Sequence, residues 1–201
     1  LERLGDAFRV LPGPHKRYAD LGDTIRTLND AVLGSRSVEL RYRTARRGVE
    51  SDRRLDPYKV WYHAGSLYVI GHDHLSGEIR TFAVDRILSI EASDEAFEVA
   101  TDFDFDAYIA SSFGVIAEPA VPVRIRFDAE WAAYVSEREW HASQSIETRD
   151  DGGILLAMEV GPSHELANWI LSFGGGAEVL EPEALRDEVR AALEAALAHY
   201  A

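Results

Sequence analysis

The sequence predicts an α+β protein in which a small β barrel or strongly bent sheet precedes a ferredoxin-like α/β sandwich. Two observations predict this class. Between residues 36 and 100, short segments alternate apolar and polar side chains with a period of two. After residue 119, strand-like and helix-like segments follow the order βαββαβ plus a final helix. We therefore expect four regions: a linker and helix over 1–35, a β domain over 36–100, a connector over 101–118 and the sandwich over 119–201.

The first region contains helical patterns on either side of chain breakers. Residues 1–9 are typical of the end of a helix, and Leu11-Pro-Gly-Pro14 is typical of a linker. From Leu21 to Leu33, apolar residues recur on one helical face, and Gly34 is expected to end that helix.

The β domain is expected to contain about five short strands joined by tight turns, which is typical of a small barrel or bent sheet. Val38, Leu40 and Tyr42 alternate with charged residues, as in a half-buried strand. Pro57 is expected to begin or interrupt a strand, because proline has no N–H for the ladder. The remaining strands and turns are predicted at 60–62, 63–66 (turn), 67–70, 74–77 (turn), 79–84 and 87–90, with a further turn at Arg46-Arg47-Gly48.

The second half alternates between strand and helix periodicities. A short helix is expected within 102–109 of the connector. Asp128 and Ser163 are expected to cap two later helices, since short polar side chains favour that position. Strands are predicted at 121–127, 143–149, 154–160 and 177–180, and helices at 128–138, 163–173 and 182–200.

The charge distribution favours a focused anionic site over general nucleic-acid coating. The chain of 201 residues has a net charge of −14, but residues 36–60 hold eight basic and four acidic side chains. The sequence has no cysteine, which excludes disulfides and thiolate metal sites. It also has no apolar run of membrane-spanning length and no secretion signal. We therefore expect a cytoplasmic protein without a membrane partner.

Arginines and aromatic residues on the predicted strands are the candidate binding residues. Arg80 and Arg86 lie six residues apart, so a regular strand would place both on one face together with Phe82. Two guanidinium groups on one face would suit a phosphate. Tyr68 and Tyr42 would stack on bases or pack in the core, and Arg54 would extend the basic face or lie in solvent. Arg86 has the alternative of an ion pair with Asp85.

Together these segments resemble the WYL-domain transcriptional regulators and their C-terminal extension. The matching segments are Leu40-Arg-Tyr42, Leu55-Asp-Pro57, 65–71 (GSLYVIG), 78–87 (EIRTFAVDRI), Ser143-Gln144, 171–174 (LSFG) and 179–186 (VLEPEALR). The spacing aligns Leu67-Tyr68-Val69, rather than Trp61-Tyr62-His63, with the Trp-Tyr-Leu triplet that names the family. Only the tyrosine of that triplet is retained.

The resemblance implies an Sm-like (SH3-like) β barrel that senses a ligand and controls an N-terminal winged-helix DNA-binding head. It also implies a nucleic-acid-like or nucleotide effector, such as single-stranded DNA, held by Tyr68, Arg80, Phe82 and Arg86. The sole methionine is Met158, and residues 1–35 carry no helix-turn-helix pattern, so we expect a fragment without its head. We expect no catalytic residue, cofactor or metal.

Two alternatives to the sensor hypothesis remain. His72, Asp73 and His74, with His63 nearby, have the residue types of a metal-dependent hydrolase. The second half, with an edge strand and an amphipathic final helix, has the features of a dimerisation module. The second alternative is compatible with the sensor hypothesis, and we expect a homodimer.

Overall fold

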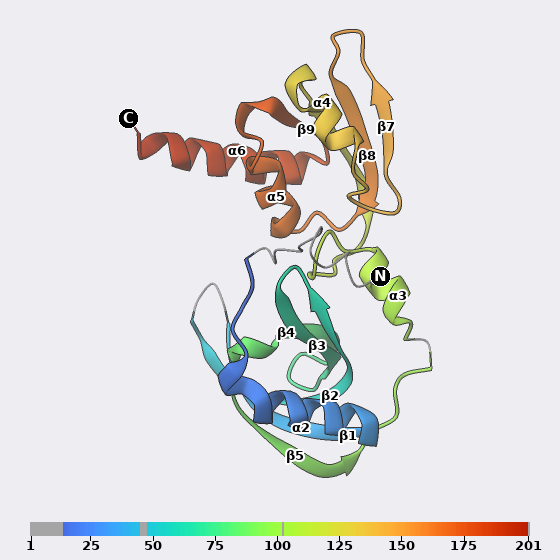
Figure 1. Cartoon of the computed structure of the whole chain (residues 1–201), viewed down its shortest axis with the longest axis vertical. Coiled ribbons are helices and arrows are strands. Elements are labelled where there is room, and N and C mark those ends of the chain that lie inside the picture. Colours follow the sequence, from blue (N-terminus) through green and yellow to red (C-terminus); the bar gives the residue numbers. More distant parts are fainter. Residues whose placement is uncertain (1–13, 45–47, 102, 201) are drawn as a thin grey trace, which may run out of the picture. The chain divides into compact units, whose positions relative to one another are not determined.

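The computed structural model describes residues 14–44, 48–101 and 103–200 and divides into two compact units, Leu1–Asp102 and Phe103–Ala201 (Figure 1). The helix predicted over residues 1–9 and most of the turn predicted at Arg46-Arg47-Gly48 lie outside the described residues. Among the helices that are described, none has both the length and the hydrophobicity needed to cross a membrane.

The first unit is one helix packed on an antiparallel five-stranded sheet. Its elements are η1 (Ala19–Leu21), α2 (Gly22–Gly34), β1 (Arg36–Arg43), β2 (Glu50–His63), β3 (Ser66–Asp73), β4 (Glu78–Ala83), η2 (Val84–Arg86) and β5 (Ile87–Ala96). The strand order is β4-β3-β2-β1-β5. The described strands contain no pairing between β4 and β5 that would close the sheet into a barrel. The α+β class is confirmed, and the sheet is open.

Helix α2 confirms the predicted helix and covers the core of the first unit. Leu28 and Ala31 are buried among residues of the sheet, as the helical spacing of apolar residues requires. The helix ends at Ser35, which adopts a left-handed conformation (φ 48°) and donates its N–H to the carbonyls of Ala31 and Val32. The short turn into β1 therefore begins directly at the end of the helix.

Strand β2 runs through Pro57, where the sequence predicted a beginning or an interruption. It pairs with β1 from Glu50 to Leu55 and with β3 from Leu55 to His63. The pairing with β3 shifts between Pro57 and Lys59, which is a β-bulge. The bulge accommodates the proline, which cannot donate a ladder hydrogen bond, and the strand continues beyond it.

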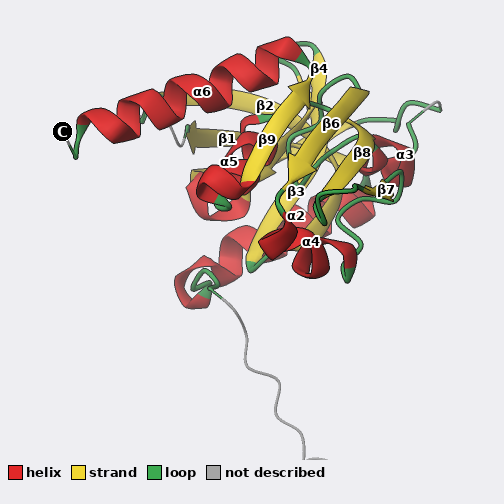
Figure 2. Ribbon diagram, turned by 90° about the horizontal axis from the view of Figure 1, so that it is seen from above, coloured by secondary structure: helices red, strands yellow, loops and turns green. Residues whose placement is uncertain are grey.

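The second unit is an antiparallel four-stranded sheet with helices packed against it (Figure 2). Its elements are α3 (Phe105–Ala110), β6 (Val121–Phe127), α4 (Ala129–Ser136), β7 (Ser145–Thr148), β8 (Ile154–Val160), α5 (His164–Leu171), η3 (Gly174–Gly176), β9 (Ala177–Glu181) and α6 (Glu183–Ala198). The strand order is β7-β8-β6-β9. Each strand and helix predicted after residue 119 is present, with ends that differ by a few residues.

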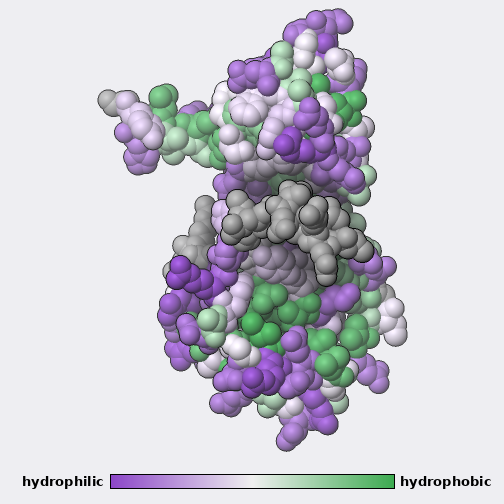
Figure 3. Space-filling view, in the orientation of Figure 1, coloured by the Kyte–Doolittle hydropathy of each residue, from purple (hydrophilic) through white to green (hydrophobic). Residues whose placement is uncertain are grey.

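The core of the second unit lies between this sheet and its helices. Phe127 on β6 is fully buried and makes edge contacts with Trp169 and Phe173 at ring-centroid distances of 5.8 and 5.0 Å. On α6, Leu185 and Val189 are buried, whereas Leu193 and Leu197 of the same stripe are exposed. The last turns of α6 extend past the sheet and carry hydrophobic as well as hydrophilic surface (Figure 3).

Candidate functional site

The register of β3 and β4 separates the predicted binding residues between two faces of the sheet. Tyr68 lies opposite Ala83, whereas Arg80 lies opposite Gly71. Opposed residues share a face and successive residues alternate, so Tyr68 and Arg80 project from opposite faces. Arg80 and Phe82 therefore share a face, as a regular strand requires, and Tyr68, the other residue expected to hold the effector, lies on the opposite face.

Phe82 and Tyr42 lie in the core of the first unit. Both side chains are buried, and their rings meet edge to face at a centroid distance of 5.0 Å. Buried rings in this arrangement support the surrounding structure and are not available as stacking surfaces for a base. Tyr42 therefore takes the core position that the sequence left open as an alternative, and Phe82 lies beneath the surface instead of facing solvent.

The strand predicted at 79–84 is present as β4, which ends at Ala83, and the chain then turns into the 3₁₀ helix η2, so the condition of a regular strand from Arg80 to Arg86 is not met. The alternation of side chains between the two faces of the sheet therefore stops before Arg86. The side on which Arg86 lies cannot be inferred from that of Arg80. The Tyr42 hydroxyl accepts the backbone N–H of Ala83 at 3.2 Å, which fixes the point where η2 begins. The core aromatic pair thus holds the segment that carries both arginines.

Arg80 and Arg86 are the least neutralised cations among the predicted binding residues. The side chain of Arg80 is 50% exposed, and its guanidinium lies 3.7 Å from the carboxylate of Glu78. No carboxylate within the described parts of the chain forms an ion pair with Arg86. Asp85, its expected partner, instead binds the Lys16 ammonium at 2.6 Å. Exposed pairs as long as that of Arg80 contribute little, so the Arg80 guanidinium is at most weakly neutralised.

Four arginines of the segment 36–60 are bound to carboxylates of the same unit, namely Arg41, Arg43, Arg53 and Arg54. Arg41 and Arg43 both bind Glu50, at 3.1 and 2.7 Å, and Arg54 pairs with Glu95. The hydrogen bond from Arg43 is the main cause that lowers the pKa of Glu50. Part of the positive charge of residues 36–60 is therefore compensated, and Arg54 is not part of a free basic face.

Tyr68 belongs to an aromatic group on the opposite face of the sheet. Its ring lies 5.7 Å from that of Trp61, which lies directly opposite on β2, and Trp61 lies 5.6 Å from the ring of His63. Tyr68 and Trp61 are half-buried, so part of each ring is accessible. Trp61, which the sequence places on the neighbouring strand, thus adds a second aromatic ring beside Tyr68.

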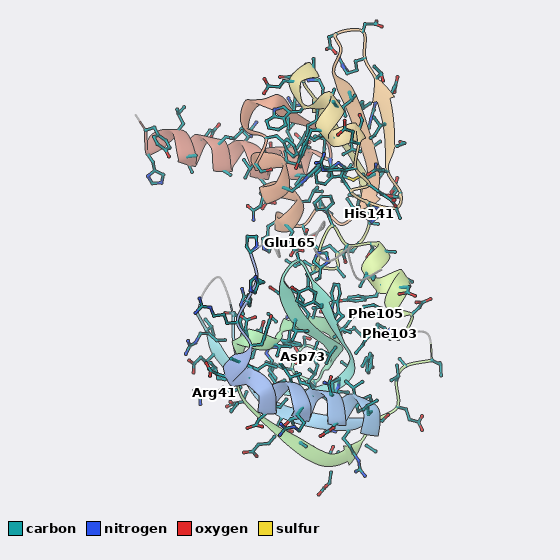
Figure 4. The ribbon with its side chains drawn as sticks, in the orientation of Figure 1. Arg41, Asp73, Phe103, Phe105, His141 and Glu165 are labelled. Atoms are coloured by element: carbon teal, nitrogen blue, oxygen red, sulfur yellow. The ribbon has the colours of Figure 1, made fainter. Side chains whose placement is uncertain are left out.

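Asp73 is bound to Arg53 and is separated from the histidines on either side of it. Its carboxylate accepts the Arg53 guanidinium at 2.5 Å and the Ser76 hydroxyl at 2.9 Å. In Figure 4, Asp73 lies inside the first unit, whereas Arg41 lies at its rim. Because Asp73 points to the other side of β3 from His72, the proposed hydrolase triplet of His72, Asp73 and His74 is not assembled.

A different carboxylate meets the two histidines. Asp56 lies opposite His72 in the β2–β3 ladder, and its Oδ2 lies 2.8 Å from Nε2 of His74 and 3.8 Å from Nδ1 of His72. Local sequence could not identify Asp56, because it lies 16 and 18 residues before the histidines and reaches them only through strand pairing.

Two surface hollows are described, and neither suits an anionic effector. The hollow in the first unit is lined by Glu39, Leu40, Arg41, Asp52, Ser89 and Glu91, so carboxylates dominate it. The hollow in the second unit is lined by Asp106, Ile109, Ala110, Glu139, Trp140, His141 and Ala142. Its His141 is held by the Ser143 hydroxyl at 2.7 Å and by the carbonyl of Ala110 at 2.8 Å (Figure 4). Ser143 Oγ is itself bound to the backbone of Glu159, which makes this group structural.

Two family models match this chain in succession. The WYL domain model matches residues 23–92, and the WCX domain model matches residues 119–197. The WYL match begins within α2 and includes every strand that carries the predicted binding residues. The WCX match covers all strands of the second unit.

Curated relatives and solved structures extend these matches along most of the chain. Protein PafC of Mycobacterium tuberculosis (strain H37Rv) is 26% identical over 171 residues, which cover 85% of this chain and 52% of PafC. Protein PafB of Mycobacterium leprae is 27% identical over 179 residues, covering 86% of this chain and 53% of PafB. The chain thus spans about half the length of the curated relatives it matches.

Two solved structures are similar to this chain at low identity, and the first shares its fold. The crystal structure of a CRISPR Cas-related protein is 12% identical with a TM-score of 0.59, covering 89% of this chain and 52% of that chain. The proteasome accessory factor B/C (PafBC) of Arthrobacter aurescens is 24% identical with a TM-score of 0.44, covering 94% of this chain and 28% of that chain.

Proposed function

Because this chain carries a WYL domain followed by a WCX domain, we propose that it is the ligand-sensing part of a bacterial transcriptional regulator. DNA would be bound by an N-terminal winged-helix head outside these residues, in a cytoplasmic protein. The role is binding and not catalysis. The hydrolase alternative loses its basis, since Asp73 forms an ion pair with Arg53 instead of joining the histidines.

We propose that the effector is nucleic-acid-like or a nucleotide and that its phosphate binds Arg80 and Arg86. The observation that carries this proposal is that Arg80 has only a long, exposed pair with Glu78 and no carboxylate in the described part of the chain pairs with Arg86, whereas Arg41, Arg43, Arg53 and Arg54 bind carboxylates closely. A guanidinium offers paired donors to phosphate oxygens, so a free one is a suitable contact. Tyr42 and Phe82 support this segment from the core.

Tyr68 and Trp61 are the proposed stacking residues. They lie on the opposite face from Arg80. However, β4 is the edge strand of the sheet, and only β3 lies between β4 and β2, the strand that carries Trp61. A strand of several nucleotides that follows the edge would reach both faces, whereas a mononucleotide would contact one. Single-stranded nucleic acid binds through such combinations of stacking and backbone charge.

The test is fluorescence anisotropy of a labelled short single-stranded DNA titrated with this chain at low and high salt. We expect saturable binding that weakens with salt and is lost in Arg80→Ala/Arg86→Ala, because phosphate contacts release counterions. The matched control is Arg26→Ala/Arg190→Ala, which removes the same charge from two exposed helical ion pairs. Equal binding by both double variants would refute the arginine assignment.

The stacking residues have their own test in the same assay. Tyr68→Ala and Trp61→Ala are each expected to weaken binding of single-stranded DNA more than binding of a mononucleotide. Base stacking contributes about 1–3 kcal/mol for each base. The exposed Tyr62, on the same strand as Trp61 but one residue further along, is the control. An unchanged affinity in both variants would show that the ligand does not reach this face.

We also propose specific folds for the two units. The order β7-β8-β6-β9, antiparallel throughout and with α4 and α5 as the connections, supports a ferredoxin-like sandwich. The strongly paired β1, β2 and β3 with the bulge in β2 support an Sm-like arrangement in the first unit.

A homodimer through the second unit is the remaining part of this proposal. The apolar stripe of α6 continues past the core at Leu193 and Leu197, which are exposed one helical turn apart. A second copy of the same helix would cover it. Sedimentation velocity is expected to show a dimer that becomes a monomer in Leu193→Glu/Leu197→Glu. A monomeric parent at micromolar concentration would contradict this.

A further inference from the structure

We propose that Asp56, His72 and His74 form a binding site for a divalent metal ion of the zinc type. One carboxylate oxygen and one imidazole nitrogen from each histidine lie within 4.8 Å of one another. Two imidazoles and one carboxylate are a donor set that Zn²⁺ and neighbouring transition metals accept. Mg²⁺ and Ca²⁺ prefer oxygen ligands throughout, so the histidines favour the former class.

The β2–β3 ladder positions all three side chains. Asp56 and His72 are directly opposed in the register, which places their side chains on the same face. Beyond the end of β3, the His74 N–H donates to the carbonyl of Arg54 at 3.0 Å, so the chain continues beside β2. The ligands therefore come from paired backbone segments, which hold a metal site more firmly than a free loop does.

Ser37 orients the carboxylate toward the histidines. Its hydroxyl donates to Oδ1 of Asp56 at 2.6 Å, and Ser37 is completely buried. The other oxygen, Oδ2, is the one that lies near Nε2 of His74 and Nδ1 of His72, at 2.8 and 3.8 Å. A hydrogen bond that fixes a ligating carboxylate in this way is a regular feature of metal sites.

The burial of the three residues gives the site a closed base and an open side. The Asp56 side chain is 11% exposed, whereas those of His72 and His74 are 34% and 35% exposed. An ion can therefore enter past the imidazoles. Three protein ligands leave at least one coordination position for water or an anionic oxygen, as in open zinc sites. His72 shares the face of Tyr68 and not that of Arg80, so this inference does not depend on the arginine site.

The test is isothermal titration of the chelator-stripped chain with ZnCl₂ in a metal-free buffer. We expect one saturable site that Asp56→Asn, His72→Ala and His74→Ala each weaken at least about tenfold. Ser37→Ala is expected to weaken it by about 10–100-fold, since it removes the group that orients the ligand. The control is His164→Ala, which removes an exposed histidine at the start of α5.

Cobalt provides a second readout that a purely structural Asp56–His74 hydrogen bond would not produce. Co²⁺ bound by this donor set is expected to give visible absorption that disappears in the His72 and His74 variants. If the His72 and His74 variants bind Zn²⁺ as the parent does, the ion does not bind these histidines. If His164→Ala weakens binding equally, the binding is adventitious. Either result contradicts the proposal. Circular dichroism checks folding. Should Asp56→Asn unfold, the two histidine variants decide, because those side chains are partly exposed.

Discussion

Arg53 and Asp73 form a buried ion pair that joins β2 to the end of β3. Nη1 of Arg53 lies 2.5 Å from Oδ2 of Asp73, with side-chain exposures of 13% and 0%. The Arg53 guanidinium also lies 5.6 Å from the centre of the Phe82 ring, and its Nε donates to the Ser51 hydroxyl. Asp73 in turn accepts the Ser76 hydroxyl within the β3–β4 turn. The pair therefore connects the core, the turn and two strands.

Removing Arg53 is expected to destabilise the first unit strongly. Arg53→Met leaves the Asp73 charge buried without its partner, which costs about 3–5 kcal/mol of unfolding free energy. Urea denaturation measures the change, and Asp73→Asn combined with Arg53→Met should recover part of it. Asp23→Ala, which breaks an exposed pair with Arg26, is the control and should change stability by at most about 1 kcal/mol. Similar effects for Arg53→Met and Asp23→Ala would contradict a structural role for the buried pair.

Gly71 is expected to tolerate no side chain. A Cβ at this position would lie 2.1 Å from the Asp56 carbonyl oxygen and 2.9 Å from Cα of Pro57, beside the bulge in β2. Gly71→Ala must therefore move backbone, and we expect a loss of about 1–3 kcal/mol by thermal or urea unfolding. Gly22→Ala at the start of α2 has open space and helical backbone, so it should be neutral or stabilising by up to about 1 kcal/mol. A neutral Gly71→Ala would show that the two strands lie further apart.

Glu165 is expected to hold the segment before β6 against α5. Its Oε2 accepts the backbone N–H groups of Val115 and Ile116 at 2.8 and 2.9 Å (Figure 4). Glu165→Ala leaves both donors without this acceptor, so hydrogen exchange at these two amides should accelerate and stability should fall by about 1–3 kcal/mol. Glu130→Ala in the first turn of α4 is the control. Unchanged exchange at residues 115 and 116 would contradict the contact.

The pKa of Glu50 is expected to depend on Arg43 more than on Arg41. The hydrogen bond from Arg43 is the largest cause that lowers this pKa. A carboxyl with a lowered folded-state pKa stabilises the fold above its unfolded-state pKa, and that contribution is lost as the pH falls through the folded value. An NMR titration of the Glu50 carboxyl carbon should show its pKa rise toward the ordinary glutamate value in Arg43→Ala and rise less in Arg41→Ala. The reverse order would contradict the observed geometry.

Elements with a clear periodicity could be predicted from the sequence. The apolar spacing of α2 and the alternation in β1 depend on neighbouring residues, and both elements appear where these patterns place them. Strand β2 could not be predicted through Pro57, because the bulge that accommodates the proline depends on pairing with β3. The Ala64-Gly65 turn is local as well, since both residues adopt positive φ (44° and 82°), as a two-residue hairpin loop requires.

The candidate site was less predictable, because it depends on where alternation stops and on long-range register. The sequence predicts a break between the strands at 79–84 and 87–90 but not the 3₁₀ helix η2 that fills it, so the position of Arg86 does not follow from alternation. Trp61 and Asp56 reach Tyr68 and His72 only through pairing of β2 with β3. Which arginines of the segment 36–60 are compensated likewise depends on carboxylate partners such as Glu50 and Glu95.

Leu55 is paired on both sides at once, with Val38 on β1 and with Asp73 on β3. Because a shift by one residue turns every side chain of a strand to the other face, slippage of β2 would disturb two hairpins together. It would bring Arg54 into the core in place of Leu55 and separate Asp73 from Arg53. Misalignment of β2 therefore disrupts contacts on both of its sides at once.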